Sequence, residues 1–273
     1  MSAQPGAGTL ASGTSTGSVE APIETSLNLY RFPALYDTLK APDAEDIAAV
    51  RGLIVRFVGE PRWSILDPAC GPGNWLAPFA AESSMLAGND NCPEMVDYTR
   101  ANTGAIVTLG DMYAPPIDAR FDVVLEASGV TSIVPDADRL RHWVRNLGGM
   151  LTQRGAVILL LNFETPVPPR LPATLWRSRW RNVPGGKARI HYELVEDRPG
   201  VQRIRRSVDV RGGDWPQLIV EDYELRVWPG EVLDTLKQVP GMRLMACADP
   251  DKPAKLNAAP SGARLLVFQP DRA

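Results

Sequence analysis

Short apolar runs alternate with helical segments through the middle of this 273-residue chain. The apolar runs have the length of buried strands, and they cover 64–68, 85–90, 106–109, 121–126 and 156–163. Between them, the spacing of apolar residues predicts helices over 75–81, 93–101 and 136–151, the last ending near Arg154. Parallel strands need long crossover connections, which are usually helices. The alternation therefore predicts an α/β domain with a mostly parallel sheet and helices on both faces.

The beginning of the chain differs in composition from this core. Residues 1–26 are mostly Gly, Ser, Thr and Ala, which cannot bury enough surface to offset the entropy lost on ordering. We therefore expect a disordered tail, and it lacks the basic start and apolar core of a secretory signal. From 27 to 59 the pattern is helical, with Asp43 placed to cap a helix whose apolar residues are Ile47, Val50, Ile54, Val55 and Val58.

The alternation of strands and helices stops after Glu164. A segment rich in Pro, Trp and Arg precedes three alternating runs over 188–195, 201–210 and 218–227, with Pro199-Gly200 and Gly212-Gly213 between them. Such turns predict a small antiparallel insert, after which a helix over 229–239 and strands over 242–246 and 264–268 complete the sheet. The predicted organisation is a tail (1–26), an α/β core with an N-terminal helical lid (27–164), a β insert (165–228) and a closing helix and strands (229–273).

Composition limits the kind of protein. The chain is 44% hydrophobic and 22% charged, which excludes a mainly disordered chain, and no apolar run approaches the roughly 20 residues that span a bilayer. Its three cysteines, Cys70, Cys92 and Cys247, are far apart, and with two histidines they do not suggest a metal site. We expect a soluble, cytoplasmic, metal-independent protein with no membrane partner.

The net charge of −3 conceals a basic segment. Residues 170–211 contain eleven Arg or Lys and four Asp or Glu, a balance of +7, so the remaining residues sum to −10. A basic segment on an acidic body suggests an anionic partner. Apolar and polar residues alternate along this segment as in β-strands, and it carries no recognised nucleic-acid-binding module. We therefore expect the segment to act as a lid that covers an aromatic or anionic small molecule, and not to bind nucleic acid.

A loop of small residues follows the first strand, in Asp67-Pro68-Ala69-Cys70-Gly71-Pro72-Gly73. Small residues at such a place let the backbone turn tightly beneath a ligand. A dinucleotide fingerprint would need G-x-G-x-x-G, but Ala69 precedes the two glycines and Leu76 stands where the third would fall. Asp67 also suits a cationic or zwitterionic ligand better than a phosphate.

Taken in order, these residues resemble the class I S-adenosylmethionine-dependent methyltransferases. An acid precedes small-x-Gly-x-Gly; the second strand ends in Gly88-Asn89-Asp90 with Met95 beyond; the third leads to Gly110-Asp111-Met112; the fourth reads FDVVLE over 121–126. Gln153-Arg154-Gly155 departs from the L-x-P-G-G turn that the family usually has. The resemblance implies a Rossmann-like, seven-stranded sheet with S-adenosyl-L-methionine as cofactor.

The resemblance also implies roles for individual residues. Asp90 would bind the ribose hydroxyls, Asp111 the adenine amine and Glu126 the methionine end of the cofactor. The full set of expected cofactor-binding residues is Tyr30, Tyr36, Asp67, Ala69, Gly71, Gly73, Asp90, Asn91, Met95, Asp111, Met112 and Glu126. The two tyrosines and Met95 fit a purely packing role equally well.

The insert resembles that of glycine and amino-sugar N-methyltransferases, in which it roofs the active site. The resemblance implies acceptor contacts from Trp176, Trp180, Tyr192 and Tyr223. His191 and Glu126 are the candidate catalytic residues, and His142 is expected on the surface. No D/N-P-P-Y/F motif follows the fourth strand, which argues against methylation of amides and nucleic-acid adenines.

The expected function is methyl transfer from S-adenosylmethionine to N or O of a small metabolite or natural product in secondary metabolism. Two alternatives remain: an RNA or protein methyltransferase that uses the basic insert, and a non-catalytic protein that retains the fold. A homodimer is also compatible with the sequence.

Overall fold

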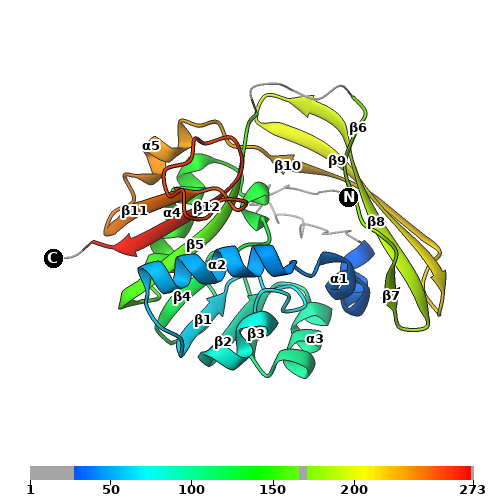
Figure 1. Ribbon diagram of the computed structural model, residues 1–273, viewed down its shortest axis with the longest axis horizontal. Coiled ribbons are helices and arrows are strands. Elements are labelled where there is room, and N and C mark those ends of the chain that lie inside the picture. Colours follow the sequence, from blue (N-terminus) through cyan, green and yellow to red (C-terminus); the bar gives the residue numbers. More distant parts are fainter. Residues whose placement is uncertain (1–27, 166–170, 272–273) are drawn as a thin grey trace, which may run out of the picture.

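Seven strands form the main sheet in a computed structural model that describes residues 28–165 and 171–271. They are β1 (Trp63–Asp67), β2 (Ser83–Asp90), β3 (Ile106–Leu109), β4 (Phe121–Glu126), β5 (Leu151–Phe163), β11 (Met242–Ala248) and β12 (Gly262–Pro270). Their order across the sheet is β11-β12-β5-β4-β1-β2-β3 (Figure 1). The first five strands run parallel, whereas β12 is antiparallel to both of its neighbours. The predicted mostly parallel, seven-stranded sheet is confirmed.

Helices cover both faces of this sheet. They are α2 (Ala44–Phe57), α3 (Pro93–Thr103), α4 (Ala137–Gly148) and the short α5 (Val232–Leu236). The predicted cap of α2 is present, since the Asp43 carboxylate accepts from the amides of Glu45 and Asp46. One apolar cluster includes Trp143 of α4 and another includes Ile54 of α2. Among the described helices, none is both long and apolar enough to cross a bilayer.

Three sequence-based helix predictions were wrong at their ends or in type. The segment expected as a helix over 75–81 is a 3-10 helix, η2 (Ala77–Glu82), where Pro78 has no amide hydrogen to donate. α4 stops at Gly148, and the residues from Leu151 already pair with β4 as part of β5. The helix expected over 229–239 is reduced to α5.

A second, antiparallel sheet is formed by the predicted insert. Its strands are β6 (Ala173–Arg177), β7 (Arg181–Val183), β8 (Gly186–Arg198), β9 (Val201–Gly212) and β10 (Leu218–Arg226), in the order β10-β9-β8-β6 with β7 paired to β8. The sequence had indicated β8, β9 and β10 but read β6 and β7 as part of a linker rich in Pro, Trp and Arg. The two ends of the insert meet where the Trp228 amide donates to the Asn162 carbonyl at 2.7 Å.

An N-terminal segment lies between the two sheets (Figure 1). It consists of a 3-10 helix, η1 (Asn28–Arg31), and α1 (Pro33–Lys40). Leu29, Leu35 and Leu39 share one apolar cluster with residues of β8 and β9. On its other side, Asp37 accepts a hydrogen bond from the Tyr98 hydroxyl of α3 at 3.0 Å. The expected tail, 1–26, lies outside the described residues.

A buried ion pair fastens this segment to the insert. Arg206 of β9 and Glu221 of β10 are 4% and 6% exposed, and the Arg206 Nε donates to Glu221 Oε2 at 2.7 Å. The other carboxylate oxygen, Oε1, accepts from the Leu29 amide at 2.8 Å. The preceding residue, Arg205, points to the opposite face of the sheet and pairs with the exposed Asp222.

These neighbouring arginines allow a matched test of stability. Removing one partner of a buried pair leaves an uncompensated charge, so we expect Arg206→Ala to lower the free energy of unfolding by about 3–5 kcal/mol. The exposed pair is screened by solvent, so Arg205→Ala should leave the unfolding midpoint almost unchanged. Urea denaturation of both variants measures the difference. An equal loss in the two variants would contradict the assigned role of the buried pair.

Candidate functional site

The strand order reverses between β1 and β4, and at such a point the carboxyl ends of parallel strands form a ligand crevice. Here the crevice is bordered by the loop after β1, by Asp90 at the end of β2 and by Glu126 at the end of β4. Asp67, the last residue of β1, is 2% exposed, and its Oδ1 accepts from the Ala69 amide at 3.0 Å. The predicted ligand loop therefore begins at a buried carboxyl group.

Asp90 joins this loop to the end of β2. Its Oδ2 accepts from the Gly71 amide at 2.8 Å and its Oδ1 from the Cys92 amide at 2.9 Å. Burial raises the pKa of Asp90, while these amide hydrogen bonds act in the opposite direction. Since a carboxylate has about four acceptor sites, Asp90 keeps capacity for the hydroxyls of a ligand.

The two loop glycines have different surroundings. Both have positive φ, 52° at Gly71 and 90° at Gly73. A methyl group on Gly73 would lie 2.6 Å from the Thr103 Cγ2, because the loop rests on α3 there. A methyl group on Gly71 would meet nothing within 4 Å. Gly71 therefore faces open space where a ligand can approach the backbone.

Glu126 ends β4 with one side-chain oxygen fully used. Oε1 accepts from the Ser128 amide, the Ser128 hydroxyl and the Val130 amide at 2.9, 2.6 and 3.0 Å. Oε2 is buried without a hydrogen-bond partner. Burial raises the pKa of Glu126, and burial raises that of Asp67 well above its usual value, with the charges of Glu126 and Asp90 adding to the shift. This end of the crevice is suited to a cationic group that donates hydrogen bonds.

Four other predicted cofactor residues follow β2 and β3. Asp111 is exposed, and its Oδ1 accepts from the Tyr113 amide at 2.9 Å. Met112 is half-buried, with its carbonyl accepting from Trp143 Nε1 at 2.8 Å. Asn91 is exposed, whereas Met95 is fully buried in α3. Their roles toward a ligand stay predictions.

Four tyrosines, the tyrosine cluster, lie between the N-terminal segment and the insert. The rings of Tyr30 and Tyr36 stack at 5.3 Å, and the Arg206 guanidinium lies 5.7 Å from the Tyr30 ring and 5.3 Å from that of Tyr223. Tyr192 completes the cluster on β8. Burial raises the pKa of Tyr30, Tyr36 and Tyr223, so these phenols remain protonated hydrogen-bond donors. The Cys92 Sγ, two residues beyond Asp90, lies 3.9 Å from the Tyr30 carbonyl oxygen, so Tyr30 is near the end of β2 that borders the crevice.

The predicted acceptor residues divide between the two faces of the insert. Trp176 lies 5.9 Å from the Tyr192 ring and thus joins the tyrosine cluster. Trp180 instead lies between the guanidinium groups of Arg189 and Arg211, at 4.7 and 4.4 Å. Side chains alternate along a strand, so these arginines occupy the face opposite the cluster.

His191 occupies this outer face as well. It is adjacent to Tyr192 in β8, and its Nε2 lies 3.4 Å from the Thr174 Oγ1. The structure does not bring His191 to the crevice. Glu126, the other candidate catalytic residue, borders the crevice directly.

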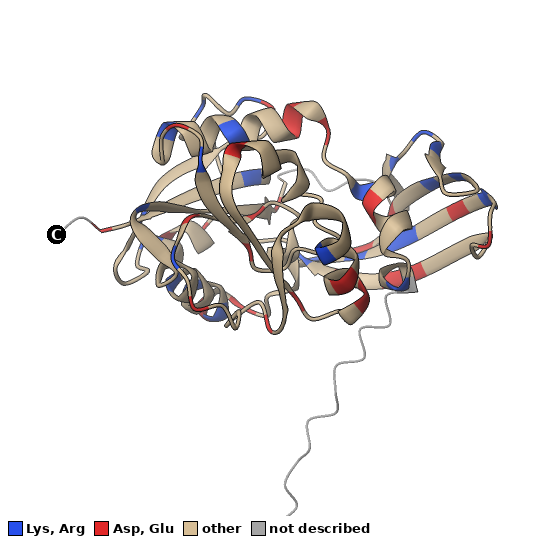
Figure 2. Cartoon of the chain, turned by 90° about the horizontal axis from the view of Figure 1, so that it is seen from below, with Lys and Arg blue, Asp and Glu red and all other residues tan. Residues whose placement is uncertain are grey.

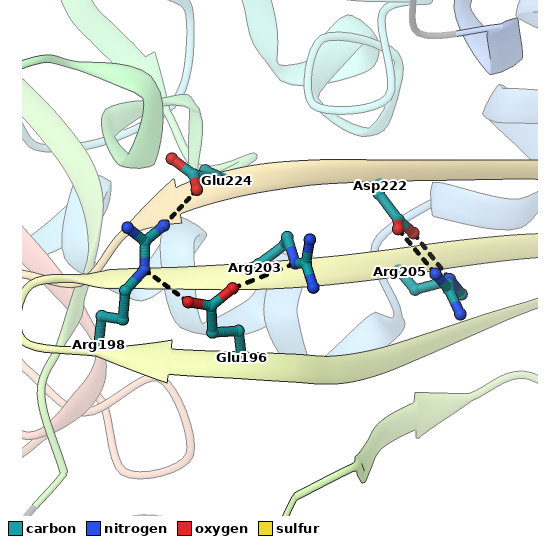
Figure 3. Close-up of polar contacts among 6 residues, drawn as sticks. All are labelled: Glu196, Arg198, Arg203, Arg205, Asp222 and Glu224. Carbon is teal, nitrogen blue, oxygen red and sulfur yellow. Dashed lines mark hydrogen bonds and ion pairs between the residues drawn. The ribbon is translucent and has the colours of Figure 1, made fainter.

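Several arginines on the outer face of the insert form ion pairs. Arg198 contacts Glu196 and Glu224, Arg203 contacts Glu196, and Arg205 contacts Asp222 (Figure 3). Acidic and basic residues are interspersed along the strands of this sheet (Figure 2). Two of the acids belong to β10, beyond the segment whose charge was counted, so the apparent +7 is partly neutralised in the fold. Arg170 lies outside the described residues.

Sequence reasoning missed three buried polar side chains near the candidate site. Arg206 and Glu221 point inward. The sequence signal for this was their spacing: Arg206 lies two residues from both Ile204 and Val208, and Glu221 two residues from both Ile219 and Tyr223, so each shares a strand face with these residues. Asn89 was read only as part of a motif. A polar residue at the end of an otherwise apolar strand indicates a buried side chain that needs partners.

Comparison with known proteins agrees with this geometry. Residues 65–155 match a family model described as a methyltransferase domain. Over 129 residues the chain is 26% identical to the dTDP-4-amino-2,3,4,6-tetradeoxy-D-glucose N,N-dimethyltransferase of Saccharopolyspora spinosa. The matched region is 46% of this chain and 52% of that protein. The chain thus spans about half the length of the curated relative that it matches.

Solved structures extend the likeness of the fold to most of the chain. The sugar N-methyltransferase KedS8 from Streptoalloteichus sp. has a TM-score of 0.68 at 20% identity, covering 97% of this chain and 100% of that one. CalS10, an amino pentose methyltransferase from Micromonospora echinaspora, has a TM-score of 0.61 at 17% identity, covering 83% and 91%. Strand order and the solved structures together show that the chain has the fold of these methyltransferases, and its residues 65–155 match the methyltransferase-domain family.

Proposed function

We propose that the protein is a methyltransferase that uses S-adenosylmethionine to methylate an amine of a small-molecule acceptor, an amino sugar carried by a nucleotide. The observation that carries this proposal is the pair of buried carboxyl groups, Asp67 and Glu126, at the ligand crevice. Glu126 Oε2 is buried without a partner, and an ammonium group of the cofactor's methionine moiety would satisfy it.

The chain's own residues fit the rest of the cofactor. Asp90 has the acceptor capacity for two ribose hydroxyls, and the open side of Gly71 lets the ligand approach the backbone. Asp111 is exposed at the end of β3 and can accept from an adenine amine. When bound, the cofactor supplies an electrophilic methyl group on a positively charged sulfur. The negative charges of Asp67 and Glu126 favour binding of that cation.

The acceptor side favours an amine over a hydroxyl. Both histidines of the chain lie away from the crevice: His191 is on the outer face of the insert, and His142 lines a surface pocket beside Tyr113 and Arg145. A hydroxyl acceptor usually needs a general base, whereas a neutral amine is itself a sufficient nucleophile. The protein then has to align the two reacting atoms and exclude water, which the tyrosine cluster and the insert above the crevice can do.

The relatives support an amino sugar as the acceptor. The curated relative is an N,N-dimethyltransferase of a dTDP-linked amino sugar, and the two solved structures are a sugar N-methyltransferase and an amino pentose methyltransferase. The ion pairs of Arg189, Arg198, Arg203 and Arg205 favour a small acceptor over RNA, since the charges of these four arginines already have acidic partners.

A transfer assay with labelled S-adenosylmethionine tests this function. We expect label in nucleotide-linked 3-amino or 4-amino sugars and none in the matched sugars with a hydroxyl at the same carbon. RNA and protein serve as further acceptors. Transfer to RNA or protein alone would support the alternative enzyme class, and cofactor binding without any transfer would support a non-catalytic role.

The two loop glycines give a prediction for cofactor binding. Gly71→Ala keeps a positive φ at a cost of about 1–2 kcal/mol and places its methyl in the ligand's path. We expect a folded protein that binds S-adenosylmethionine about tenfold or more weakly, which corresponds to 1.4 kcal/mol. Gly73→Ala collides with Thr103 and should instead lower the melting temperature strongly. Calorimetric titration and thermal melts separate the two effects, and unchanged affinity in Gly71→Ala would remove the loop from the site.

The buried carboxyl groups predict a pH dependence. Their raised pKa values mean that Asp67 and Glu126 hold protons in the free protein at a pH where exposed carboxyl groups are ionised. A bound cation expels these protons, so affinity should rise as the pH rises above the usual titration range of carboxyl groups, by up to about tenfold per pH unit for each proton released. The stability of the free protein should fall as pH rises through the same raised pKa values, because the unfolded carboxyl groups ionise at lower pH.

Glu126→Gln provides the control for this pH dependence. It removes one titrating group, so the variant should bind more weakly at neutral pH and with a shallower pH slope. Titrations in buffers of different ionisation enthalpy count the protons released. Affinity that is flat or falling over this range in the unaltered protein would contradict the assignment.

A further inference from the structure

A buried carboxamide connects two loops of the ligand crevice. Asn89, next to last in β2, is 0% exposed. Its Nδ2 donates to the Pro68 carbonyl in the loop after β1 and to the Gly110 carbonyl after β3, both at 3.0 Å. Its Oδ1 accepts from the Thr108 hydroxyl at 3.0 Å. Every hydrogen-bonding group of the side chain is therefore used.

The orientation of the amide follows from its partners. Nitrogen and oxygen of an Asn side chain are distinguished by the hydrogen bonds they make. Two carbonyl oxygens on one side require the NH₂ group there, and a hydroxyl donor on the other side suits the oxygen. Thr108 thus holds the amide in the orientation that lets Asn89 donate to both loops.

Each of the two carbonyls fixes a peptide plane beside a predicted cofactor residue. In a trans peptide the C=O and the following N–H point in opposite directions. Holding the Pro68 carbonyl sets the direction of the Ala69 amide, which donates to Asp67. Holding the Gly110 carbonyl sets the Asp111 amide, which then points away from Asn89. Gly110 also packs tightly, because a methyl group there would come within 2.9 Å of the Asn89 Oδ1.

The two loops carry opposite ends of the proposed cofactor site. Asp67 and Gly71 follow β1, where the methionine and ribose moieties are expected, and Asp111 follows β3, where adenine is expected. Between β1 and β3 lies β2 alone, so a side chain at the end of β2 is the direct route from one loop to the other. A single NH₂ group with two donors can hold both carbonyls at once, which an apolar residue cannot do.

We propose that Asn89 is a positioning residue for cofactor binding. Its side chain sets the distance between the loop after β1 and the loop after β3, so that one ligand can contact both loops. This rests on the proposed function only in that the ligand spans the two loops. Asn89 does not touch the ligand in this assignment; it acts through the Pro68 and Gly110 peptides. Without the two N–H donors of Asn89, the position of one loop relative to the other is no longer fixed.

Affinity for S-adenosylhomocysteine tests this role on the full-length chain. The ligand has the adenosine and amino-acid moieties of the cofactor but cannot react. We expect Asn89→Ala to weaken its binding by about tenfold or more in the folded fraction. In steady-state assays, the KM for S-adenosylmethionine should rise with little change in kcat at saturation.

Gln269→Ala is the matched control. Gln269 is also a buried carboxamide that donates to a backbone carbonyl, that of Phe57 at 2.8 Å, but near the end of β12 at the opposite edge of the sheet. Its removal should lower the unfolding midpoint and leave the dissociation constant within about twofold of the unaltered protein. The same pattern in Asn89→Ala, lower stability with unchanged affinity, would show that Asn89 is structural only.

If Asn89→Ala does not fold, Thr108→Val alone tests the role, and unchanged affinity in that variant would contradict the proposal. The substitution is close to isosteric and removes the hydroxyl that donates to Asn89 Oδ1, together with its longer 3.4 Å contact with the Gly88 carbonyl, so we expect a smaller loss of affinity. If Asn89→Ala folds, the double variant gives a second test. In the double variant, Thr108→Val should add nothing to the loss caused by Asn89→Ala, because the two residues act as a unit. Additive losses would overturn the proposal. Failure of the unaltered protein to bind S-adenosylhomocysteine at all would instead reject the proposed function.

Discussion

The burial of two carboxyl groups at the edge of the main sheet is the constraint on which the site depends. Asp67 and Glu126 end neighbouring strands, and burial raises the pKa of each. Buried carboxylates are costly unless they are hydrogen-bonded or paired with a cation. Amide and hydroxyl donors satisfy Glu126 Oε1, but Oε2 has none. The fold therefore holds negative charge in a position that a cationic ligand completes.

The insert and the N-terminal segment close this site from above. The Arg206–Glu221 pair reaches the Leu29 amide, so the polar contact that holds the insert's inner face also holds the segment that carries Tyr30 and Tyr36. Outward-facing arginines take no part in this closure. Arg203 and Arg205 pair with acids on the neighbouring strands, so part of the basic charge on the outer face of the insert is neutralised (Figure 3).

Much of the core could be predicted because its signals are local. The strands over 106–109 and 121–126 were predicted with their observed ends. The second is a buried strand of the parallel sheet with an apolar run, whereas the first lies at the sheet edge and exposes Ile106 and Leu109. Predictions were weaker where long-range pairing decides the structure. Leu151 begins a strand because it pairs with Phe121, and β6 forms because it pairs with β8, although it lies in a segment rich in Pro, Trp and Arg. His191 and Trp180 could not be assigned to a face before the register of the insert was known.

The sequence by itself determined the α/β class, the ligand loop after β1 and the acids at the strand ends, because strand periodicity and small residues act over short distances. Only the tertiary structure decided which charges remain available. It paired the arginines of β9 with acids from β10, buried Arg206 against Glu221, and brought Asn89 within reach of Pro68 and Gly110. Such contacts join residues that are distant in the chain, so their strength depends on strand order and register, which no local pattern contains.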